Sequence, residues 1–489
     1  MIEESVKIHD KFSLEIKLGL NARRKQQISD FEFNTWIFLP SSLGINPSTY
    51  EKRHFYRDVN SNIRLITPVY LLRDIAGEKN TPFTILQKSF ENLSADPTRT
   101  NSAEYEYQIK MFLSILKSAL RDDIAHIIKN TFNEDNDYLI ESYINNIQLI
   151  TAKYRSLRRI INTPTVSKYL LNFYQFGDEF MSNLIEQHTF KLLRDLEKSN
   201  HEDTAQIRGT IVAVINKEIE YKKDKGFSVA EQDDPNRNRD MIFRLGLLKK
   251  FADNELFLTA NKKKDGILVE QVYYSIAAGI SMIFATGIAF SFQLKYGNFT
   301  MPFFVALVVG YMLKDRIKEL GRYYFSYKLG RSYFDHKTKI SLKGTHIGWS
   351  KESVDFITED KVPDEVLKLR DRSAILEANN RAFTERIILY RKLVRIFREK
   401  LDSSIQYNTT GINDIIRFNI SNYITKMDNS DFPLFVTGDD NSVKIIMGER
   451  VYYLNLLMQF KNDGQLVYKR YRVALNRDGI IDIEKIKYQ

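Results

Sequence analysis

Residues Val272–Phe292 read VYYSIAAGISMIFATGIAFSF and contain no charged side chain. A helix needs about 20 apolar residues to cross a hydrocarbon core about 30 Å thick, and this stretch has that length. A second apolar stretch, MPFFVALVVGYML at Met301–Leu313, follows closely. It is shorter, and it crosses a bilayer only if its flanking side chains snorkel or the membrane thins locally. Together the two stretches predict a central transmembrane helical hairpin at residues 268–315.

Basic residues flank this hairpin on both sides, whereas the connection between its helices holds only Lys295. By the positive-inside rule both flanks and both termini are expected in the cytoplasm, with residues 293–300 outside. Abundant Lys, Asn, Ile and Tyr point to an AT-rich bacterial genome, so the expected location is a bacterial inner membrane. The flanking side chains are predicted to contact anionic lipid headgroups. They are Lys262, Lys263, Lys264, Lys314, Arg316, Lys318 and Arg322.

Small side chains line two faces of the first apolar stretch. Helices associate in lipid through close packing, so small residues indicate contact faces. One face is predicted to hold the second helix and the other a second copy of the chain, which makes a homo-oligomer the expected state; lipid-facing Gly and Ala are the alternative. The predicted packing residues are Ala277, Ser281, Ala285 and Ala289 on one line, Gly279 and Gly287 on the other, and Ala306 and Gly310 in the second helix.

Neither apolar stretch contains a charged residue, which argues against ion or proton transport. Two alternatives to a simple anchor stay open. A small oligomeric pore could be lined by hydroxyls, although such groups more often bond to the backbone of their own helix. The hairpin could also be the buried core of a soluble protein. The hydroxyl residues concerned are Ser275, Ser281, Thr286 and Ser291.

The remainder of the chain predicts an α+β fold, beginning with a β-rich module at residues 1–100. Phe12, Leu14, Ile16 and Leu18 alternate with polar residues, which indicates a strand with one buried face. We expect this strand to form a β-hairpin with the aromatic segment at residues 31–40. A third short strand is expected at residues 63–66. These strands predict a small N-terminal sheet.

A cytosolic helical bundle is predicted at residues 101–262. From about Asn101 the apolar residues are spaced by three and four, as in Ile109, Leu113 and Leu116. The pattern continues through helices predicted at 138–161, 166–196 and 204–221. A further short helix at 241–258 precedes the membrane segment.

Two more segments follow the hairpin. Residues 316–405 are predicted to hold a juxtamembrane helix and a long amphipathic helix near 373–401, because Ile387, Tyr390 and Val394 are spaced by three and four. Residues 406–489 are predicted to form a C-terminal antiparallel β-meander. Its three strands at 451–460, 465–475 and 480–486 are separated by turns that contain Asn-Asp-Gly and Arg-Asp-Gly.

Composition limits the chemistry that this chain can carry out. It has no cysteine, which excludes disulfides, thiolate nucleophiles and cysteine-bound metals. Its seven histidines show no ligand spacing, and no phosphate-binding glycine loop or nucleophile elbow occurs. No cofactor or metal site is predicted. The net charge of +10 fits nucleic acid, an anionic membrane surface or no specific partner, and the apolar hairpin in the same chain favours the membrane surface.

No reaction or ligand can be identified from these patterns. The expectation is a membrane-anchored, oligomeric scaffold, sensor or regulatory protein that faces the cytosol and can bind a cytosolic protein partner. One alternative is a membrane-perturbing or pore-forming effector controlled by its cytosolic domains. The other is a membrane-anchored enzyme with a site assembled from scattered residues.

Overall fold

The protein is described from a computed structural model, over residues 2–22, 26–77, 81–130, 133–198, 204–324, 333–370, 385–437, 442–462 and 464–487. These residues form helices and antiparallel sheets, which confirms a mixed α+β fold. The chain divides into two compact units. Unit 1 comprises residues 1–62, 259–401 and 414–489, and unit 2 comprises residues 63–258 and 402–413.

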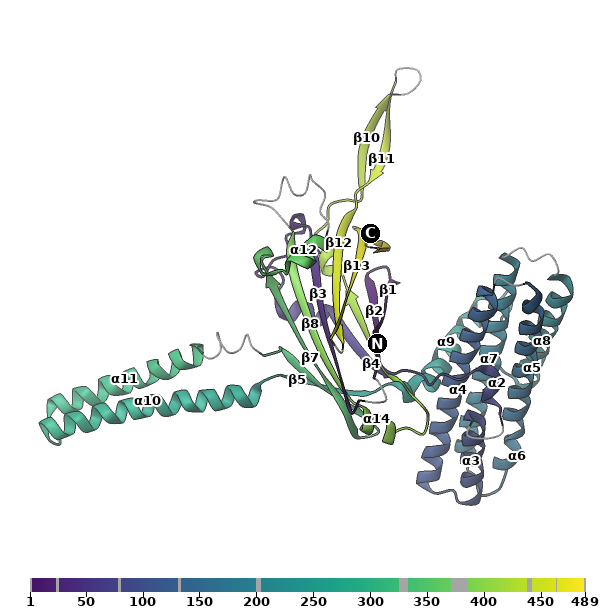
Figure 1. The fold of residues 1–489 in the computed structure, drawn as a ribbon, viewed down its shortest axis with the longest axis horizontal. Helices are drawn as coiled ribbons and strands as arrows, with labels where there is room; N and C mark the ends of the chain where they lie inside the picture. The colour runs from purple at the N-terminus through teal and green to yellow at the C-terminus, as the bar shows by residue number, and fades with distance from the viewer. Residues whose placement is uncertain are drawn as a thin grey trace. The chain divides into compact units, whose positions relative to one another are not determined.

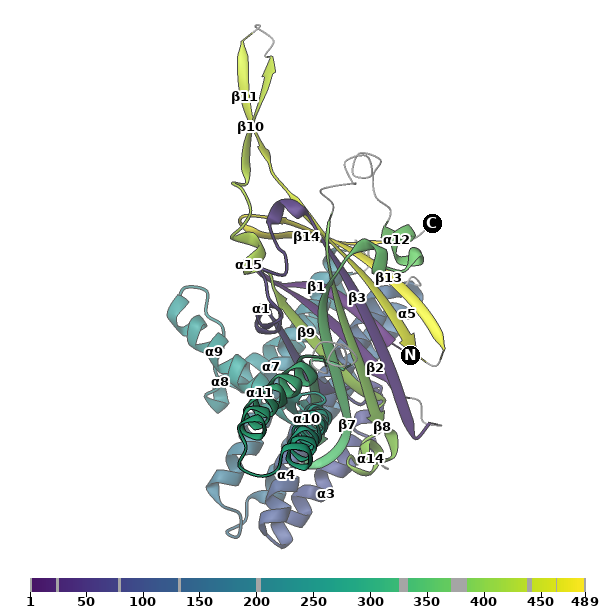
Figure 2. The same ribbon diagram turned by 90° about the vertical axis from the view of Figure 1, so that its left-hand side faces the viewer.

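Unit 1 is built on three antiparallel sheets (Figures 1 and 2). The largest has eight strands in the order β14-β13-β12-β3-β8-β7-β6-β5, the second has the order β1-β2-β9-β4, and the third is the β10–β11 ribbon. The strands are β1 Ile2–Asp10, β2 Ser13–Asn21, β3 Ile28–Leu39, β4 Val59–Leu65, β5 Thr259–Lys264, β6 His336–Leu342, β7 Thr345–Ile357, β8 Arg386–Phe397, β9 Gly411–Asn419, β10 Asp431–Thr437, β11 Val443–Glu449, β12 Tyr452–Asn462, β13 Gln465–Asn476 and β14 Gly479–Ile486.

The main core of unit 1 lies between the eight-stranded and the four-stranded sheets. Phe55, from helix α1 at Lys52–Asp58, contacts the ring of Tyr390 on β8 and that of Phe418 on β9, with centroid distances of 5.3 and 5.8 Å. The odd-numbered residues of β3, such as Phe33 and Ile37, point into this same core. Burial of these side chains holds the two sheets together.

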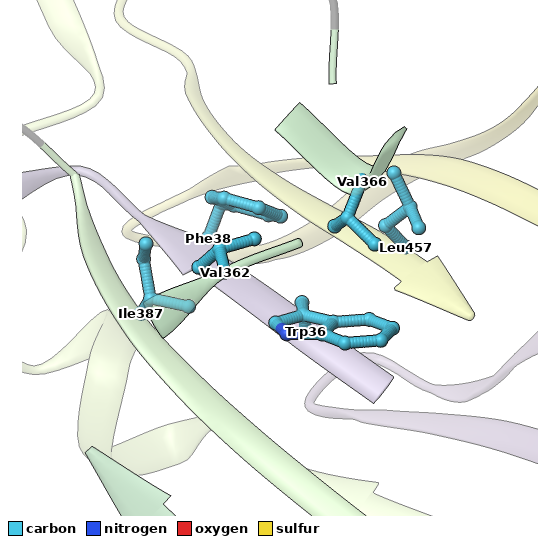
Figure 3. Close-up of a cluster of buried hydrophobic side chains, with 6 residues drawn as sticks. All are labelled: Trp36, Phe38, Val362, Val366, Ile387 and Leu457. Atoms are coloured by element: carbon cyan, nitrogen blue, oxygen red, sulfur yellow. The ribbon is translucent and has the colours of Figure 1, made fainter. Parts of the chain in front are cut away.

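A second core covers the opposite face of the eight-stranded sheet. Trp36 and Phe38 of β3 pack there against Val362 and Val366, close to helix α12 at Asp364–Arg370 (Figure 3). Successive side chains of a strand point to opposite faces, so β3 is buried on both sides. This explains its nearly continuous run of aromatic and aliphatic residues.

Unit 2 is a helical bundle. Its two longest helices, α4 and α7, pack against each other and against the remaining helices. Ring stacking of Tyr154 with Phe112 and Tyr174, at 5.8 and 5.3 Å between centroids, joins α4, α5 and α7. The helices of this unit are α2 Leu72–Ile75, α3 Pro82–Ala95, α4 Arg99–Lys129, α5 Asn133–Ser156, α6 Arg158–Ile161, α7 Lys168–Lys198, α8 Thr204–Lys225 and α9 Pro235–Asp253.

The bundle interior also contains paired charges. Lys222 is fully buried, with its Nζ 2.6 Å from Glu186 Oε2. Arg155 lies 2.8 Å from Glu218 and also donates a hydrogen bond to Ser182. Buried charges are tolerated when they are paired and hydrogen-bonded in this way. These residues therefore have a structural explanation that requires no ligand.

The prediction of a long helix near 373–401 is wrong for the residues of this segment that the structure describes. Residues 386–397 form β8, a central strand between β3 and β7, and only Arg398–Ser403 is helical, as α14. Residues 371–384 lie outside the described part of the chain. The burial of β8 has a period of two, with Ile388, Tyr390 and Val394 buried on one face. The spacing of three and four arose because apolar residues occupy both faces of this strand.

The predicted β-hairpin between the first strand and the aromatic segment is also wrong. β2 pairs with β1 and β9, whereas β3 pairs with β8 and β12. Both partners of β3, and the β9 partner of β2, lie far along the sequence. The short strand predicted at 63–66 corresponds to β4, and the predicted C-terminal meander is confirmed as β12, β13 and β14.

Candidate membrane-anchoring site

The two apolar stretches lie on consecutive helices, α10 at Ile267–Tyr296 and α11 at Met301–Tyr324. Figure 1 shows the helices side by side, joined by a short turn. Gly297 and Phe299 have positive φ angles of 76° and 61° in this turn, which allows the chain to reverse direction. α11 continues past Leu313 into the predicted basic juxtamembrane helix as far as Tyr324.

Among the described residues, α10 is the one helix that is long and apolar enough to cross a membrane by length and composition. Its most apolar window has a mean hydropathy of 1.8, and only 11% of that window is buried. The core helix of a soluble protein would be mostly buried, so this exposure argues against the soluble-hairpin alternative. α11 does not meet the same criterion. The structure therefore supports one candidate span, whereas the sequence predicts two.

Small residues form the contact between α10 and α11. Ala277 and Ser281 of α10, and Ala306 and Gly310 of α11, are the buried residues of the two helices. A Cβ placed on Gly310 would lie 3.7 Å from Ile288. These four residues are among those predicted for helix packing, and small side chains at these positions let the two backbones approach closely.

The remaining predicted packing residues lie elsewhere on α10. Ala285 contributes a backbone oxygen 3.8 Å from the Cβ position of Gly310, and Ala289 is half-buried. Gly279 and Gly287 are exposed, with no atom within 4 Å of an added Cβ. α10 thus has one small-residue face against α11 and one that α11 leaves uncovered.

The register of the two helices limits how deeply α11 can follow α10 into a bilayer. A Cβ on Gly321 would lie 2.9 Å from that of Ala277, so the charged part of α11 runs beside the first half of α10. The apolar part of α11, Met301–Leu313, extends about 20 Å at 1.5 Å per residue. That length is about two thirds of a hydrocarbon core of about 30 Å. Full crossing by this pair consequently requires local thinning of the bilayer or snorkelling by the basic residues.

The basic residues of α11 are exposed or half-buried. Lys314 Nζ lies 3.9 Å from the ring centroid of Tyr311, and the Arg322 guanidinium lies 5.3 Å from that of Tyr274. Arg316 is exposed and Lys318 is half-buried. Long stems of this kind can lie along apolar surface while the charge reaches the headgroup layer.

The lysines before α10 belong to a strand. Lys262, Lys263 and Lys264 lie on β5, which pairs with β6 at the edge of the eight-stranded sheet. Lys262 forms an ion pair with Glu352, and Lys264 lies 2.7 Å from Glu270. Two of these three lysines, which were predicted to contact lipid headgroups, therefore already have carboxylate partners within the chain.

Further ion pairs join the start of α10 to the sheet. Asp265 is paired with Lys351 of β7 at 2.8 Å, and its backbone N–H donates to the carbonyl of Asp335. Asp335 in turn accepts hydrogen bonds from Lys52 and Tyr56. Since several paired contacts hold this junction, α10 begins from an ordered base.

Glu352 is the most buried carboxylate of this base. It accepts a hydrogen bond from the hydroxyl of Tyr390 at 2.8 Å and is 5% exposed. Burial alone would raise the pKa of Glu352, but the charges of Lys392 and Lys262 and these hydrogen bonds hold its pKa below the ordinary value. Glu352 is therefore ionised at neutral pH and can balance Lys262.

Three of the four hydroxyls proposed as a pore lining bond within α10. Ser275 donates to the carbonyl of Gln271 at 2.9 Å, Ser281 to that of Ala278 at 2.8 Å, and Thr286 to that of Met282 at 2.9 Å. Hydroxyls satisfied by their own helix need no water-filled lumen. This arrangement favours an anchor over a pore.

Sequence reasoning missed Glu352, Asp265 and Lys351 as residues whose ion pairs hold the segment that leads into α10. The available signal was a charge at a buried position of a strand, such as Glu352 on β7 or Lys392 on β8. That signal can be recognised only when the segment is assigned as a strand with a period of two. Because β8 was interpreted as a helix, the buried position of Lys392 was missed. Within the described residues, no group of three or more metal-ligating side chains converges.

Comparisons with known proteins show no matching family model, no matching curated protein and no matching solved structure.

Proposed function

We propose that this chain is a membrane-anchored, oligomeric scaffold or regulatory protein, held at a bacterial inner membrane by α10 and α11. The observation that carries the proposal is the exposure of α10, an apolar helix with little protein packed on it. Burying such a surface in lipid removes the cost of exposing it to water. Anionic headgroups would interact with the basic residues of α11 and with Lys263.

The proposed topology has both termini in the cytoplasm and the turn at 297–300 outside. A helical pair that enters and returns leaves its two ends on the same side, whatever the exact depth of insertion. The basic flanks assign that side to the cytoplasm by the positive-inside rule. Thinning of the bilayer around α11 would let the turn reach the far surface.

Cysteine labelling tests this topology, because the natural chain has no cysteine. Asn298→Cys, in the turn, is expected to react in intact cells with a membrane-impermeant maleimide. The matched variant Asn236→Cys, at the start of α9, should react only after the cells are lysed. Labelling of Asn236→Cys in intact cells, or protection of Asn298→Cys, contradicts the topology.

The uncovered face of α10 is the proposed site of helix contact between copies. Gly279 and Gly287 lie two turns apart on this face, where small side chains permit close approach in lipid. Gly279→Leu with Gly287→Leu is expected to lower the oligomer fraction at least tenfold in detergent, measured by light scattering. Ile276→Leu with Ile283→Leu is the control, since it changes exposed side chains of the same helix without adding bulk. An unchanged oligomer in the glycine variant would show that this face is lipid-exposed.

An enzymatic function has less support from the described residues. A cavity of about 100 Å³ lies beside Arg155 and Glu218 in the bundle. Pockets for small-molecule ligands usually measure about 300 to 1,000 Å³. Because both charged residues are already paired with each other, this cavity gives no reason to propose a reaction.

A further inference from the structure

Three lysines lie together on one face of the eight-stranded sheet. Lys263 of β5 is directly opposite Lys337 of β6, and Lys339 is two residues further along β6. Thr338 and Ile340 are buried, so Lys337 and Lys339 share the outer face of β6. All three lysines are exposed, and no carboxylate of the described residues lies within ion-pair distance of them. We call this group the lysine face.

The lysines around this group are balanced by carboxylates. Lys262 and Lys264 of β5 each form an ion pair. Lys351 of β7 is directly opposite Lys337, and it pairs with Asp265 at 2.8 Å. Over the part of the chain that the structure describes, the neighbouring lysines are therefore neutralised, whereas the three members of the lysine face are not.

The lysine face carries an energetic cost that the fold does not offset. Like charges directly opposite each other on neighbouring strands destabilise a sheet, and Lys263 and Lys337 form such a pair. Lysines on an edge strand can serve to block pairing with other chains, which would explain Lys263 on β5. This does not explain Lys337 and Lys339, because β6 is paired on both sides, with β5 and β7. A bound anion would remove the repulsion, so the arrangement indicates an anionic ligand.

The chain path keeps the lysine face close to the anchor. β5 leads directly into α10 (Figure 1), and Lys263 precedes the first residue of this helix, Ile267, by four residues. Four residues span at most about 14 Å. From Ile267 to Val272, where the uncharged stretch begins, the helix rises about 7.5 Å, which is comparable with a headgroup layer of about 5 to 8 Å. When α10 spans the membrane, Lys263 therefore lies within about 14 Å of the outer boundary of the headgroups.

Ordered contacts hold the beginning of β6 at the same place. The backbone N–H of Asp265 donates to the carbonyl of Asp335, and a Cβ on Gly266 would lie 3.2 Å from the ring of Tyr333. Asp335 and Tyr333 come just before β6. Lys337, the second residue of β6, is therefore held near the base of α10.

We propose that the lysine face binds anionic phospholipid headgroups of the membrane that α10 enters. This inference rests on the proposed anchoring function, and it adds a contact surface on the sheet to the basic residues of α11. Charge complementarity and continuity with the anchor identify the partner. Each basic residue close to an anionic membrane surface favours binding about fivefold, so three of them favour it on the order of 100-fold.

Single-stranded nucleic acid fits this surface less well. Proteins that bind it combine cations with aromatic rings on which the bases stack. The ring beside the lysine face belongs to Trp349, which is opposite Lys339 and half-buried. The Nζ atoms of Lys337 and Lys351 lie 5.5 and 5.6 Å from its centroid, and the guanidinium of Arg395 lies at 5.2 Å. Cations already interact with this ring, which suits a tryptophan at a membrane interface better than a stacking platform.

Fluorescence quenching of the full chain in lipid nanodiscs tests this contact. Because the natural chain has no cysteine, Asn261→Cys can carry a single fluorophore beside the lysine face, opposite Lys339. A nitroxide attached to the headgroup of a trace lipid is the quencher. Quenching is expected to be at least threefold stronger in discs containing about 30% phosphatidylglycerol than in discs of phosphatidylcholine alone, because anionic headgroups attract the lysine face to the surface.

Neutralising the lysine face separates its contribution from that of the anchor. Lys263→Gln, Lys337→Gln and Lys339→Gln together should abolish the difference between the two kinds of disc. The matched control changes three other exposed lysines of unit 1 to glutamine and should retain the difference. These control lysines are Lys7, Lys11 and Lys444.

Four results would overturn the proposal. Two of them are equal quenching in both kinds of disc with the natural lysines, and an equal loss of the difference in the control. The third is binding of a labelled single-stranded oligonucleotide that the lysine-face variant loses, because nucleic acid would then be the partner. The fourth is a lower urea midpoint of the lysine-face variant without lipid, since removing unbalanced repulsion should leave the stability equal or higher.

The failure of this proposal can be distinguished from the failure of the proposed function. If α10 does not span the membrane, Asn298→Cys is not labelled in intact cells and the chain does not enter the discs. If the lysine face alone is wrong, both of these results stay positive and only the lipid-dependent difference in quenching is absent.

Discussion

Ile280→Arg combined with Ile283→Arg is expected to transfer the full chain from the membrane fraction to the soluble fraction. Both isoleucines are exposed on α10, at 55% and 73%, near the middle of its apolar stretch. An arginine at the centre of a transmembrane helix costs about 2.5 to 3.5 kcal/mol on insertion scales. Two of them disfavour insertion by roughly 6 kcal/mol, which corresponds to about a 10⁴-fold change in partitioning.

The control for this experiment places the same charges on an exposed surface of unit 2. Ile242 and Phe243 of α9 are 70% and 68% exposed. Ile242→Arg with Phe243→Arg is expected to remain in the membrane fraction after a carbonate wash. Retention of the α10 variant under the same wash would show that α10 is not the anchor.

Asp414→Ala is expected to cost unit 1 about 3 to 5 kcal/mol of unfolding free energy, because it removes the carboxylate that pairs directly with the buried ammonium of Lys392. The side chains of Asp414 and Lys392 are 1% and 2% exposed and form an ion pair. Ser61 joins the pair: its Oγ donates to Asp414 at 2.6 Å and accepts from Lys392 at 2.9 Å.

Urea unfolding followed by tryptophan fluorescence measures this effect in unit 1. The chain has two tryptophans, Trp36 and Trp349, and both belong to this unit. Asp30→Ala is the control, since its ion pair with Arg395 is exposed and such pairs contribute about 0 to 1 kcal/mol.

A double variant separates the loss of charge balance from the loss of packing. Lys392→Met with Asp414→Leu removes both charges and is expected to recover most of the stability lost in Asp414→Ala. If the double variant is as unstable as the single one, the buried charge is not the cause. A loss below about 1 kcal/mol in Asp414→Ala would also contradict the explanation.

Elements bounded by clear turns, or carrying a sustained helical repeat, could be predicted from local patterns. The meander strands β12, β13 and β14 are bounded by turns with glycine, and the bundle helices repeat apolar residues over many turns. α10 could be located because its uncharged apolar stretch is long enough to cross a bilayer. These signals are local, so no knowledge of distant partners is required.

β8 and β10–β11 could not be predicted because their apolar residues occupy both faces. On β8, Ile387 faces one core and Ile388 the other, which produces spacings that also fit a helix. In the ribbon, the apolar residues on both faces lack a covering layer within unit 1, so no alternation appears. The pairings of β3, and that of β2 with β9, were missed for a different reason: these partner strands lie hundreds of residues away in the sequence.

The sequence by itself determined the apolar length of α10, the charges on its flanks and the small residues on its two faces, because these properties depend only on residue order along one helix. Only the tertiary structure decided that α11 places charges beside the first half of α10, and that Glu352 and Lys351 form ion pairs with the segment that leads into α10. Such relations depend on the register between separate elements. Register is set by side-chain packing between segments far apart in the chain, which no local pattern records.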